Sequence, residues 1–241
     1  MSEVEANAQE RPCLNCGAVL SSRYCAECGQ RSDTSRLRLA NWAGESLATA
    51  TNLEAGLLNT IIGLTLRPGK TARRYVEGQR IRFTSPLKYS LLGAGLWLLA
   101  FSIAIETPED DGSLTALFLR YGQLINLAAI PLIAIGYLAA FLGSKYTYAE
   151  ELCLAAYIAG HTFMWRALLA LLNLTEAPVA LISQIDSVLF FAYSSWATWS
   201  FHSGRVRWIA LRVLAGLIGI VVVTVIVSLP LRMLAQMNSA G

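Results

Sequence analysis

The sequence predicts an all-α polytopic membrane protein: a five-helix transmembrane bundle preceded by a small N-terminal zinc ribbon. Three observations lead to this prediction. The chain of 241 residues is 55% hydrophobic and only 15% charged, whereas about a quarter of an ordinary soluble domain is charged. The charges gather in the first ninety residues and in a few short connections, so the remainder consists of long apolar blocks. Four of the five cysteines lie between Cys13 and Cys28.

Residues 1–12 are polar and carry no periodic apolar pattern. We expect them to form a disordered leader. They lack the apolar core of a secretory signal peptide, so insertion into a membrane is expected to depend on internal spans.

Residues 13–31 are predicted to fold as a zinc ribbon. Cys13 and Cys16 form one Cys-x-x-Cys pair, and Cys25 and Cys28 form a second after eight intervening residues. Four thiolates in a tetrahedral arrangement suit a structural Zn²⁺ ion and leave no position for water. Such a site folds a short segment and catalyses nothing. The alternatives are a redox dithiol, which needs only one pair, and unpaired surface cysteines.

Five arginines surround the two cysteine pairs, which raises the question of nucleic acid as a partner. The segment lacks base-reading aromatic residues and a groove-binding helix, so we do not expect nucleic-acid binding. A contact with a protein, or a ribbon that only stabilises its own fold, is expected instead. The arginines are Arg11, Arg23, Arg31, Arg36 and Arg38.

Residues 32–86 are predicted to form a cytoplasmic linker of amphipathic and basic helices. Within Leu39–Leu66, apolar residues fall at helical spacing among Asn, Glu and Thr residues, so this segment is too polar to span a membrane. We expect a helix that lies at the cytoplasmic surface or packs under the bundle. Pro68 and Gly78 suit the start and the end of a second, short helix, Gly69–Glu77.

Basic residues in and after this short helix are candidates for binding anionic lipid headgroups. Each is worth about 1 kcal/mol near an anionic leaflet. The alternative is that these charges only hold the N-terminal side in the cytoplasm and recognise no lipid. The candidates are Lys70, Arg73, Arg74, Arg80 and Arg82.

Five apolar blocks within residues 87–234 match the roughly 20 residues that a spanning helix needs. Pro131 lies midway in the second block and is expected to kink it. The apolar segment Leu114–Leu119 is too short to span and is expected to lie at the outer interface. The five predicted spans are Leu87–Ile105, Tyr121–Leu142, Ala149–Leu172, Val179–Phe201 and Trp208–Leu229.

The placement of basic residues predicts the orientation of these spans. Seven Lys or Arg residues lie between Arg67 and Lys88, before the first span, and acidic residues follow it. Lys145 follows the second span, and Arg205 and Arg207 follow the fourth. By the positive-inside rule, the N-terminus is cytoplasmic and the C-terminus lies outside, which is the periplasm for a bacterial inner membrane.

Ionisable residues inside a span cost about 2.5–3.5 kcal/mol at its centre, so each needs an explanation. Arg166 and Asp186 lie roughly 9–11 Å deep from the same side, on neighbouring spans joined by a short connection. We therefore expect them to form a pair that holds two helices together. The alternative is that the pair and His161 line a polar cavity, in which His161 carries protons.

Other polar residues have simpler explanations. Glu150 and Glu151 open the third span, where the helix dipole favours negative charge. His202 is placed in a cytoplasmic loop and is expected to be solvated. Cys153 is isolated inside a span, where burial leaves a thiol inert.

Several motifs between residues 13 and 89 resemble the DUF3667 family of bacterial membrane proteins. That family is characterised by a zinc-ribbon-like start, a Thr-Leu-rich helix, an Arg-Pro-Gly turn and a Tyr-x-x-Gly-x-Arg element. The resemblance implies a membrane topology and a metal site but no established activity. It does not extend to the third span, where this chain has no His next to Glu150–Glu151. The matching elements are Thr60, Arg67–Gly69, Tyr75–Arg80 and Phe83–Pro86.

No nucleophile with a base in reach, phosphate-binding loop or catalytic metal triad is recognisable, so we expect no enzyme. The favoured function is a non-enzymatic inner-membrane protein that presents its zinc ribbon as a docking or scaffold module. Its partners would be anionic membrane lipids and a protein of unknown identity. The alternative is a transporter or lipid-handling protein with a polar cavity around His161, Arg166 and Asp186. No internal repeat is visible among the spans, which counts against a transporter.

Overall fold

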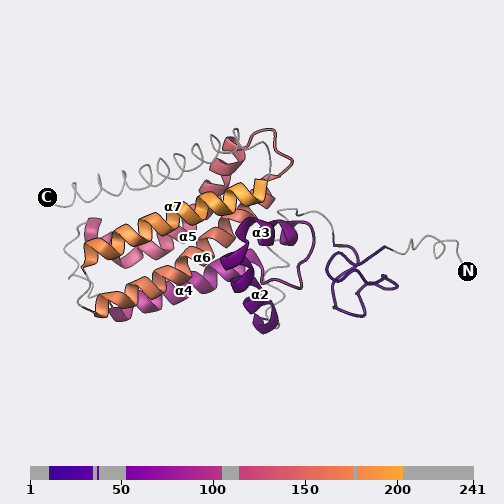
Figure 1. Cartoon of the computed structure of the whole chain (residues 1–241), viewed down its shortest axis with the longest axis horizontal. Helices are drawn as coiled ribbons and strands as arrows, with labels where there is room; N and C mark the ends of the chain where they lie inside the picture. The colour runs from indigo at the N-terminus through magenta and orange to yellow at the C-terminus, as the bar shows by residue number, and fades with distance from the viewer. Residues whose placement is uncertain (1–10, 35–36, 38–52, 105–113, 176–177, 203–241) are drawn as a thin grey trace, which may run out of the picture.

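The computed structural model describes residues 11–34, 37, 53–104, 114–175 and 178–202. Within these residues the chain is mostly helical and contains no β-strand. Helices α4 to α7 run side by side, while α2 and α3 lie at the end of the bundle next to the cysteine-containing segment (Figure 1). The helices are α2 (Leu53–Leu66), α3 (Pro68–Val76), α4 (Pro86–Ala104), α5 (Leu114–Ala140), α6 (Tyr148–Leu171) and α7 (Val179–His202), with a 3₁₀ turn, η1 (Leu172–Leu174), after α6.

Helix α6 is the centre of the bundle and packs against α4, α5 and α7. Every residue from Ala149 to Ile158 is buried, including two glutamates. Small residues bring α4 and α6 together: a Cβ atom at Gly160 would lie 2.9 Å from Ser90 Cα, and one at Gly93 would collide with the Gly160 carbonyl. Glycine at both positions therefore permits a closer helix crossing than larger residues would.

Two helices are long and apolar enough to cross a membrane, by length and composition alone. They are Pro86–Ala104 and Tyr148–Leu174, which includes η1. The most apolar part of the first is only 28% buried, whereas that of the second is 61% buried. The core helix of a soluble protein would also be mostly buried, so the exposed apolar surface of α4 is the more informative of the two.

Helices occupy the positions of four of the five predicted spans, but only α4 and α6 meet the criterion above. The five-span arrangement therefore stays a prediction. The fifth predicted span, Trp208–Leu229, and residues 1–10 of the predicted leader (residues 1–12) lie outside the described residues. Residues 11 and 12 belong to the cysteine segment: the Leu20 N–H donates to the Arg11 carbonyl at 3.1 Å, and Pro12 forms a β-bridge with Val19. Leu114–Leu119 forms the first part of the continuous helix α5. Its place at the outer interface stays a prediction.

Large apolar side chains cover the outside of the bundle. In a soluble monomer, contiguous exposed apolar patches rarely exceed a few hundred Å². Here exposed large apolar side chains occur on three helices: Leu91, Leu98, Leu99 and Ile103 on α4; Leu124, Leu132 and Ile135 on α5; and Leu181, Ile185, Val188, Leu189 and Phe191 on α7.

The linker forms the two helices that the sequence predicts. Helix α2 ends at Leu66, and the predicted residues before Leu53 lie outside the described part of the chain. Pro68 is the first residue of α3, where its missing N–H costs nothing. Gly78 follows the end of α3 with φ of +114°, a conformation that side chains other than glycine rarely adopt.

Candidate functional site

The four N-terminal cysteines come together in a single cluster. Their sulfur atoms all lie within 4.8 Å of one another. Cys13 Sγ lies 3.6 Å from Cys28 Sγ, and Cys16 Sγ lies 3.6 Å from Cys25 Sγ. With Zn–S bonds of about 2.3 Å, a regular tetrahedron has edges of about 3.8 Å. The four thiols are free and too far apart for disulfides, so this spacing suits one metal ion.

Two equivalent backbone turns build the cluster. The N–H of Gly17 donates to the carbonyl of Cys13, and the N–H of Gly29 donates to the carbonyl of Cys25, both at 2.8 Å. Each glycine has a positive φ, +83° and +73°, which lets the turn close behind the second cysteine of its pair. The repeated turn presents two sulfurs from each pair toward the same point.

The protonation of the thiols reflects their crowding. Burial raises the pKa of Cys13, but hydrogen bonds from the backbone of Cys16 and Asn15 and from neighbouring thiols outweigh it and lower the pKa to about 7. Cys16 receives a backbone hydrogen bond that lowers its pKa, yet burial and the three neighbouring sulfurs raise it to about 12. Four ionised thiols would repel one another without a cation, so the donor set fits a soft divalent metal.

The cysteine segment, residues 11–34, is seated on the loop that follows α3. The N–H of Arg82 donates to Asn15 Oδ1 and the N–H of Arg80 donates to Gln30 Oε1, both at 3.2 Å. Leu14 packs against Gly78, where a Cβ atom would come within 2.6 Å of Leu14 Cδ1. Both turns of the segment thus contribute a contact to the helical part of the chain.

Arg31, on the surface of the cysteine segment, pairs with a neighbouring acidic residue. It forms a two-point ion pair with Asp33, at 2.9 and 2.6 Å, and this pairing lowers the pKa of Asp33. One of the five arginines considered for nucleic-acid binding is therefore engaged within the segment.

A second polar site lies where α3 crosses the end of α7. Arg73 donates from Nε to the carbonyl of Phe201 at 3.1 Å and from Nη2 to the carbonyl of Ser200 at 2.6 Å. The N–H of Gly69 donates to Ser200 Oγ at 3.0 Å, and any side chain at Gly69 would collide with α7. A cation on the last carbonyls of a helix is favoured by the helix dipole, so Arg73 caps α7.

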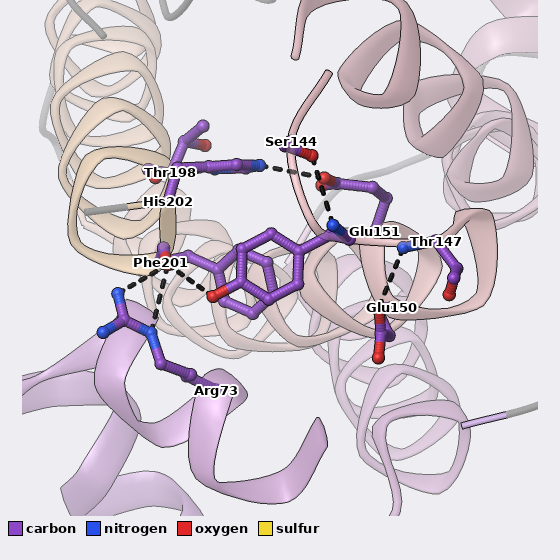
Figure 2. A network of polar contacts seen from close by, with 9 residues as sticks. Arg73, Ser144, Thr147, Glu150, Glu151, Thr198, Phe201 and His202 are labelled. Carbon is purple, nitrogen blue, oxygen red and sulfur yellow. Dashed lines mark hydrogen bonds and ion pairs between the residues drawn. The ribbon is translucent and has the colours of Figure 1, made fainter. Parts of the chain in front are cut away.

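Tyr146 completes the contacts to Phe201, donating from its hydroxyl to the same carbonyl at 3.2 Å. Burial raises the pKa of Tyr146 above its ordinary value. The hydroxyl therefore keeps its proton at physiological pH and remains a donor. Figure 2 shows Arg73 reaching Phe201 from α3, below the end of α7 in this view, while Thr147 and Glu150 lie to the right.

His202 and Glu151 form a buried pair between α7 and α6, and they point toward one another in Figure 2. His202 Nε2 lies 2.9 Å from Glu151 Oε1, and the two side chains are 3% and 0% exposed. The ring of Phe141 stacks on the imidazole with centroids 3.6 Å apart. The expectation of a solvated His202 in a loop is wrong. The residue belongs to α7, and its ring is covered by Phe141 and Tyr146, from the connection after α5, and by Glu151 of α6.

The two glutamates at the start of α6 therefore have different roles. Glu150 Oε2 accepts a hydrogen bond from the N–H of Thr147 at 2.8 Å, which suits an acid in the first turn of a helix. Glu151 is turned to the interior, and the helix dipole alone does not explain it. Sequence reasoning missed this site because its two members are 51 residues apart.

The pair predicted inside the bundle is confirmed. Arg166 Nε lies 3.0 Å from Asp186 Oδ1, joining α6 to α7, and the side chains are 17% and 26% exposed. The guanidinium also lies over the rings of Trp97 and Phe190, at 5.2 and 5.1 Å from their centroids. Cation–π contacts of this kind add to the stability of a partly desolvated cation.

His161 does not join this pair directly. Its Nδ1 lies 2.8 Å from the Tyr89 hydroxyl and its Nε2 lies 3.4 Å from Thr65 Oγ1. Thr65 already donates its hydroxyl proton to the carbonyl of Ile61 at 2.8 Å. It can therefore only accept from Nε2–H, and Nδ1 is then free to accept from Tyr89. The Tyr89 hydroxyl also lies 3.2 Å from Met164 Sδ, and a thioether sulfur is a weaker acceptor than an imidazole nitrogen. A neutral imidazole satisfies both contacts.

The five basic residues predicted to bind lipid headgroups differ in their exposure and contacts. Arg73 is half-buried and donates to the carbonyls of Ser200 and Phe201, so its binding of headgroups also stays a prediction. Lys70 and Arg82 have exposed side chains, and Arg74 and Arg80 are partly covered. For these four, binding of anionic lipid stays a prediction.

The fold and the site together define a mostly helical protein with a four-cysteine cluster that could hold a metal ion and two helices that could span a membrane. A family model described as a protein of unknown function (DUF3667) matches residues 54–97, which covers α2, α3 and the first part of α4. It is the same family that the sequence motifs resemble, and the match spans less than half of the chain. The cysteine segment lies outside the matched residues. Comparison with curated proteins and with solved structures found no match.

Proposed function

We propose that this chain is a non-enzymatic integral protein of the bacterial inner membrane that presents a zinc ribbon on the cytoplasmic side. The ribbon would act as a docking or scaffold module for another protein. One observation carries the proposal: four sulfurs with the spacing of a zinc tetrahedron lie in a segment seated at one end of a helical bundle.

The surface of the bundle supports the membrane part of the proposal. Exposed leucine, isoleucine, valine and phenylalanine side chains cover α4, α5 and α7, and hydrocarbon is the environment that such a surface favours. Trp196 and Trp199 are exposed near the end of α7 that meets α3. Tryptophan is enriched at the boundary between lipid and water, so this end would lie near a membrane face.

The donor set supports a structural role for the metal. Four cysteine ligands fill the coordination of Zn²⁺ and leave no open position for a substrate or a water molecule. The outer surface of the segment carries apolar side chains available to a partner: Val19 is 62% exposed and Tyr24 is 52% exposed. Exposed aromatic and aliphatic residues on a rigid scaffold suit protein contact.

Metal analysis of the purified full-length chain tests the zinc site. We expect one Zn²⁺ per chain and its loss in the double variant Cys13→Ser/Cys25→Ser. Cys153→Ala is the matched control, because Cys153 is buried in α6 away from the cluster, and it should retain the metal. A wild-type chain without bound zinc, or with zinc that survives the double substitution, would refute this assignment.

Photo-crosslinking in living cells tests docking. A photoreactive amino acid at Val19 or Tyr24 should give a discrete protein adduct that disappears in the Cys13→Ser/Cys25→Ser background. The same probe at Leu142, which is 71% exposed between α5 and α6, serves as the control and should not give it. Adducts that persist without the four-cysteine site would contradict a metal-dependent docking module.

A reporter fused after Gly241 tests orientation. Activity only outside the cytoplasm is expected for five spans with the ribbon inside. Activity only in the cytoplasm would require an even number of spans or an inverted bundle.

The alternative function is a transporter or lipid-handling protein with a polar cavity around His161, Arg166 and Asp186. The partial exposure of Arg166 and Asp186 favours some access to this region. The pairing of Arg166 with Asp186 favours a role in holding the helices together. The hydrogen bonds of His161 to the uncharged side chains of Tyr89 and Thr65 favour the same role. A flux that Asp186→Asn abolishes while zinc is retained would decide for the transporter.

A further inference from the structure

The hydrogen bonds of His202 determine how many protons it shares with Glu151. Nδ1 lies 3.0 Å from the carbonyl oxygen of Thr198. A carbonyl oxygen only accepts, so Nδ1 must carry a proton. Nε2 lies 2.9 Å from Glu151 Oε1. Without a proton between them, the lone pair of the ring nitrogen would face a carboxylate oxygen at hydrogen-bond distance. One further proton must lie in this contact.

We propose that Glu151 and His202 form a proton-binding site that holds one proton between α6 and α7. Two arrangements satisfy the geometry. Either an imidazolium faces a carboxylate, or a carboxylic acid donates to a neutral imidazole. The proton belongs to the pair in both cases, and the pair as a whole is neutral.

The burial of the site explains why the pair retains its proton. The two side chains are 3% and 0% exposed, and the rings of Phe141 and Tyr146 cover the imidazole. Among the described residues, Glu151 Oε2 has no hydrogen-bond partner. Removing the proton would leave a negative charge in this interior with one of its oxygens unsatisfied, which is strongly unfavourable.

The other charged or titratable groups near the site do not replace this proton. Arg73 of α3 is directed at the carbonyls of Ser200 and Phe201. Glu150 of α6 accepts from the backbone of Thr147. No other ion pair to Glu151 or His202 exists in the part of the chain that the structure describes. The charged and titratable groups nearest the site are Tyr137 from α5, Lys145 and Tyr146 from the following connection, Arg73 from α3, Glu77 and Arg80 from the residues after α3, and Glu150 and Cys153 from α6.

The shared proton lies at the end of α7, where other contacts also hold this helix in place. The same end of α7 is held by Arg73 and Tyr146 through the carbonyl of Phe201. The Gly69 N–H also donates to Ser200 Oγ there. Among these contacts at the end of α7, the one between Glu151 and His202 depends on the shared proton. The inference goes beyond the proposed docking function and does not depend on zinc.

Spectroscopy of the full-length protein in lipid nanodiscs at pH 8 tests the proposal. The chain has two histidines, so selective ¹⁵N-histidine labelling gives a simple spectrum. We expect either imidazolium signals from His202 or the infrared C=O stretch of a protonated carboxyl group. Neutral imidazole together with an ionised Glu151 would overturn the proposal.

Glu151→Gln is the matched variant. The glutamine amide can donate to Nε2 and keep the contact, while His202 stays neutral with its proton on Nδ1. The imidazolium or carboxylic-acid signal should therefore disappear. Spectra that are identical in wild type and variant would refute the assignment to this pair. If the variant does not fold, the wild-type spectra alone decide.

Discussion

The two histidines of this chain face opposite situations inside the same bundle. His161 lies in the middle of α6, and one neutral ring satisfies both of its neighbours, Tyr89 and Thr65. His202 lies at the end of α7, and its two neighbours are the Thr198 carbonyl and the Glu151 carboxyl group. The first requires a proton on Nδ1, and the second requires another proton, either on Nε2 or on the carboxyl group. The comparison teaches that depth in a bundle does not identify a proton site. What decides is whether the partners of the ring donate or accept.

The largest expected effect comes from His202→Ala. The substitution leaves Glu151 buried without a partner and removes a ring that packs on Phe141, and breaking a buried pair in this way costs about 3–5 kcal/mol. The free energy of unfolding in detergent micelles measures the loss. A loss below about 1 kcal/mol would mean that Glu151 finds water or another partner, and the contrast between the two histidines would fail.

His161→Ala is the corresponding substitution at the second histidine. It removes two hydrogen bonds between neutral groups, each worth about 0.5–1.5 kcal/mol, together with ring contacts to Tyr193 and Trp165. We expect a loss of about 2–3 kcal/mol in the same unfolding assay. The difference between wild type and variant should not change between pH 7 and 9. A pH-dependent difference would show that His161 also exchanges a proton.

The Arg166–Asp186 pair gives an intermediate case, in which an acidic and a basic side chain meet between α6 and α7. Because both side chains are partly exposed and Arg166 keeps its contacts with Trp97 and Phe190, we expect Asp186→Ala to cost about 1–2 kcal/mol, at the lower end for a charged hydrogen bond. A double-mutant cycle with Arg166→Ala measures the coupling between the two residues. Additive losses would mean that the pair contributes nothing beyond its separate contacts.

Tyr89→Phe is the smallest change and tests the tautomer assigned to His161. It removes the donor to Nδ1 and leaves the ring in place, so a loss of about 0.5–1.5 kcal/mol is expected. The ¹⁵N signals of His161 should still be those of a neutral ring with its proton on Nε2. A shift of the proton to Nδ1 would show that Tyr89 alone sets the tautomer.

The features that the sequence predicts well are those in which the interacting residues are close in the chain or the geometry follows from helix arithmetic. The cysteine cluster is one such feature, because two short motifs each bring two sulfurs to one turn. Arg166 and Asp186 are another: a short connection makes their helices neighbours, and the rise per residue places both at a similar depth. The position of α3 follows from Pro68 and Gly78 by the same local reasoning.

The polar site at the end of α7 was not predictable in this way. Arg73 and Phe201 are 128 residues apart, and Glu151 and His202 are 51 apart. From the sequence, Arg73 resembles any other basic residue near a membrane, and His202 resembles a solvated residue beside Arg205. Glycine at position 69 was the available signal, since a glycine in the first turn of a helix often marks a close approach of another backbone.

The sequence by itself determined the helical segments, the four-cysteine site and the Arg166–Asp186 pair, because local spacing and helical periodicity set which residues meet there. The tertiary structure alone decided that Arg73 caps α7 and that His202 shares a proton with Glu151. The physical reason is that hydrogen-bond partners and burial depend on how distant helices pack, and the charge state of a buried group depends on those partners.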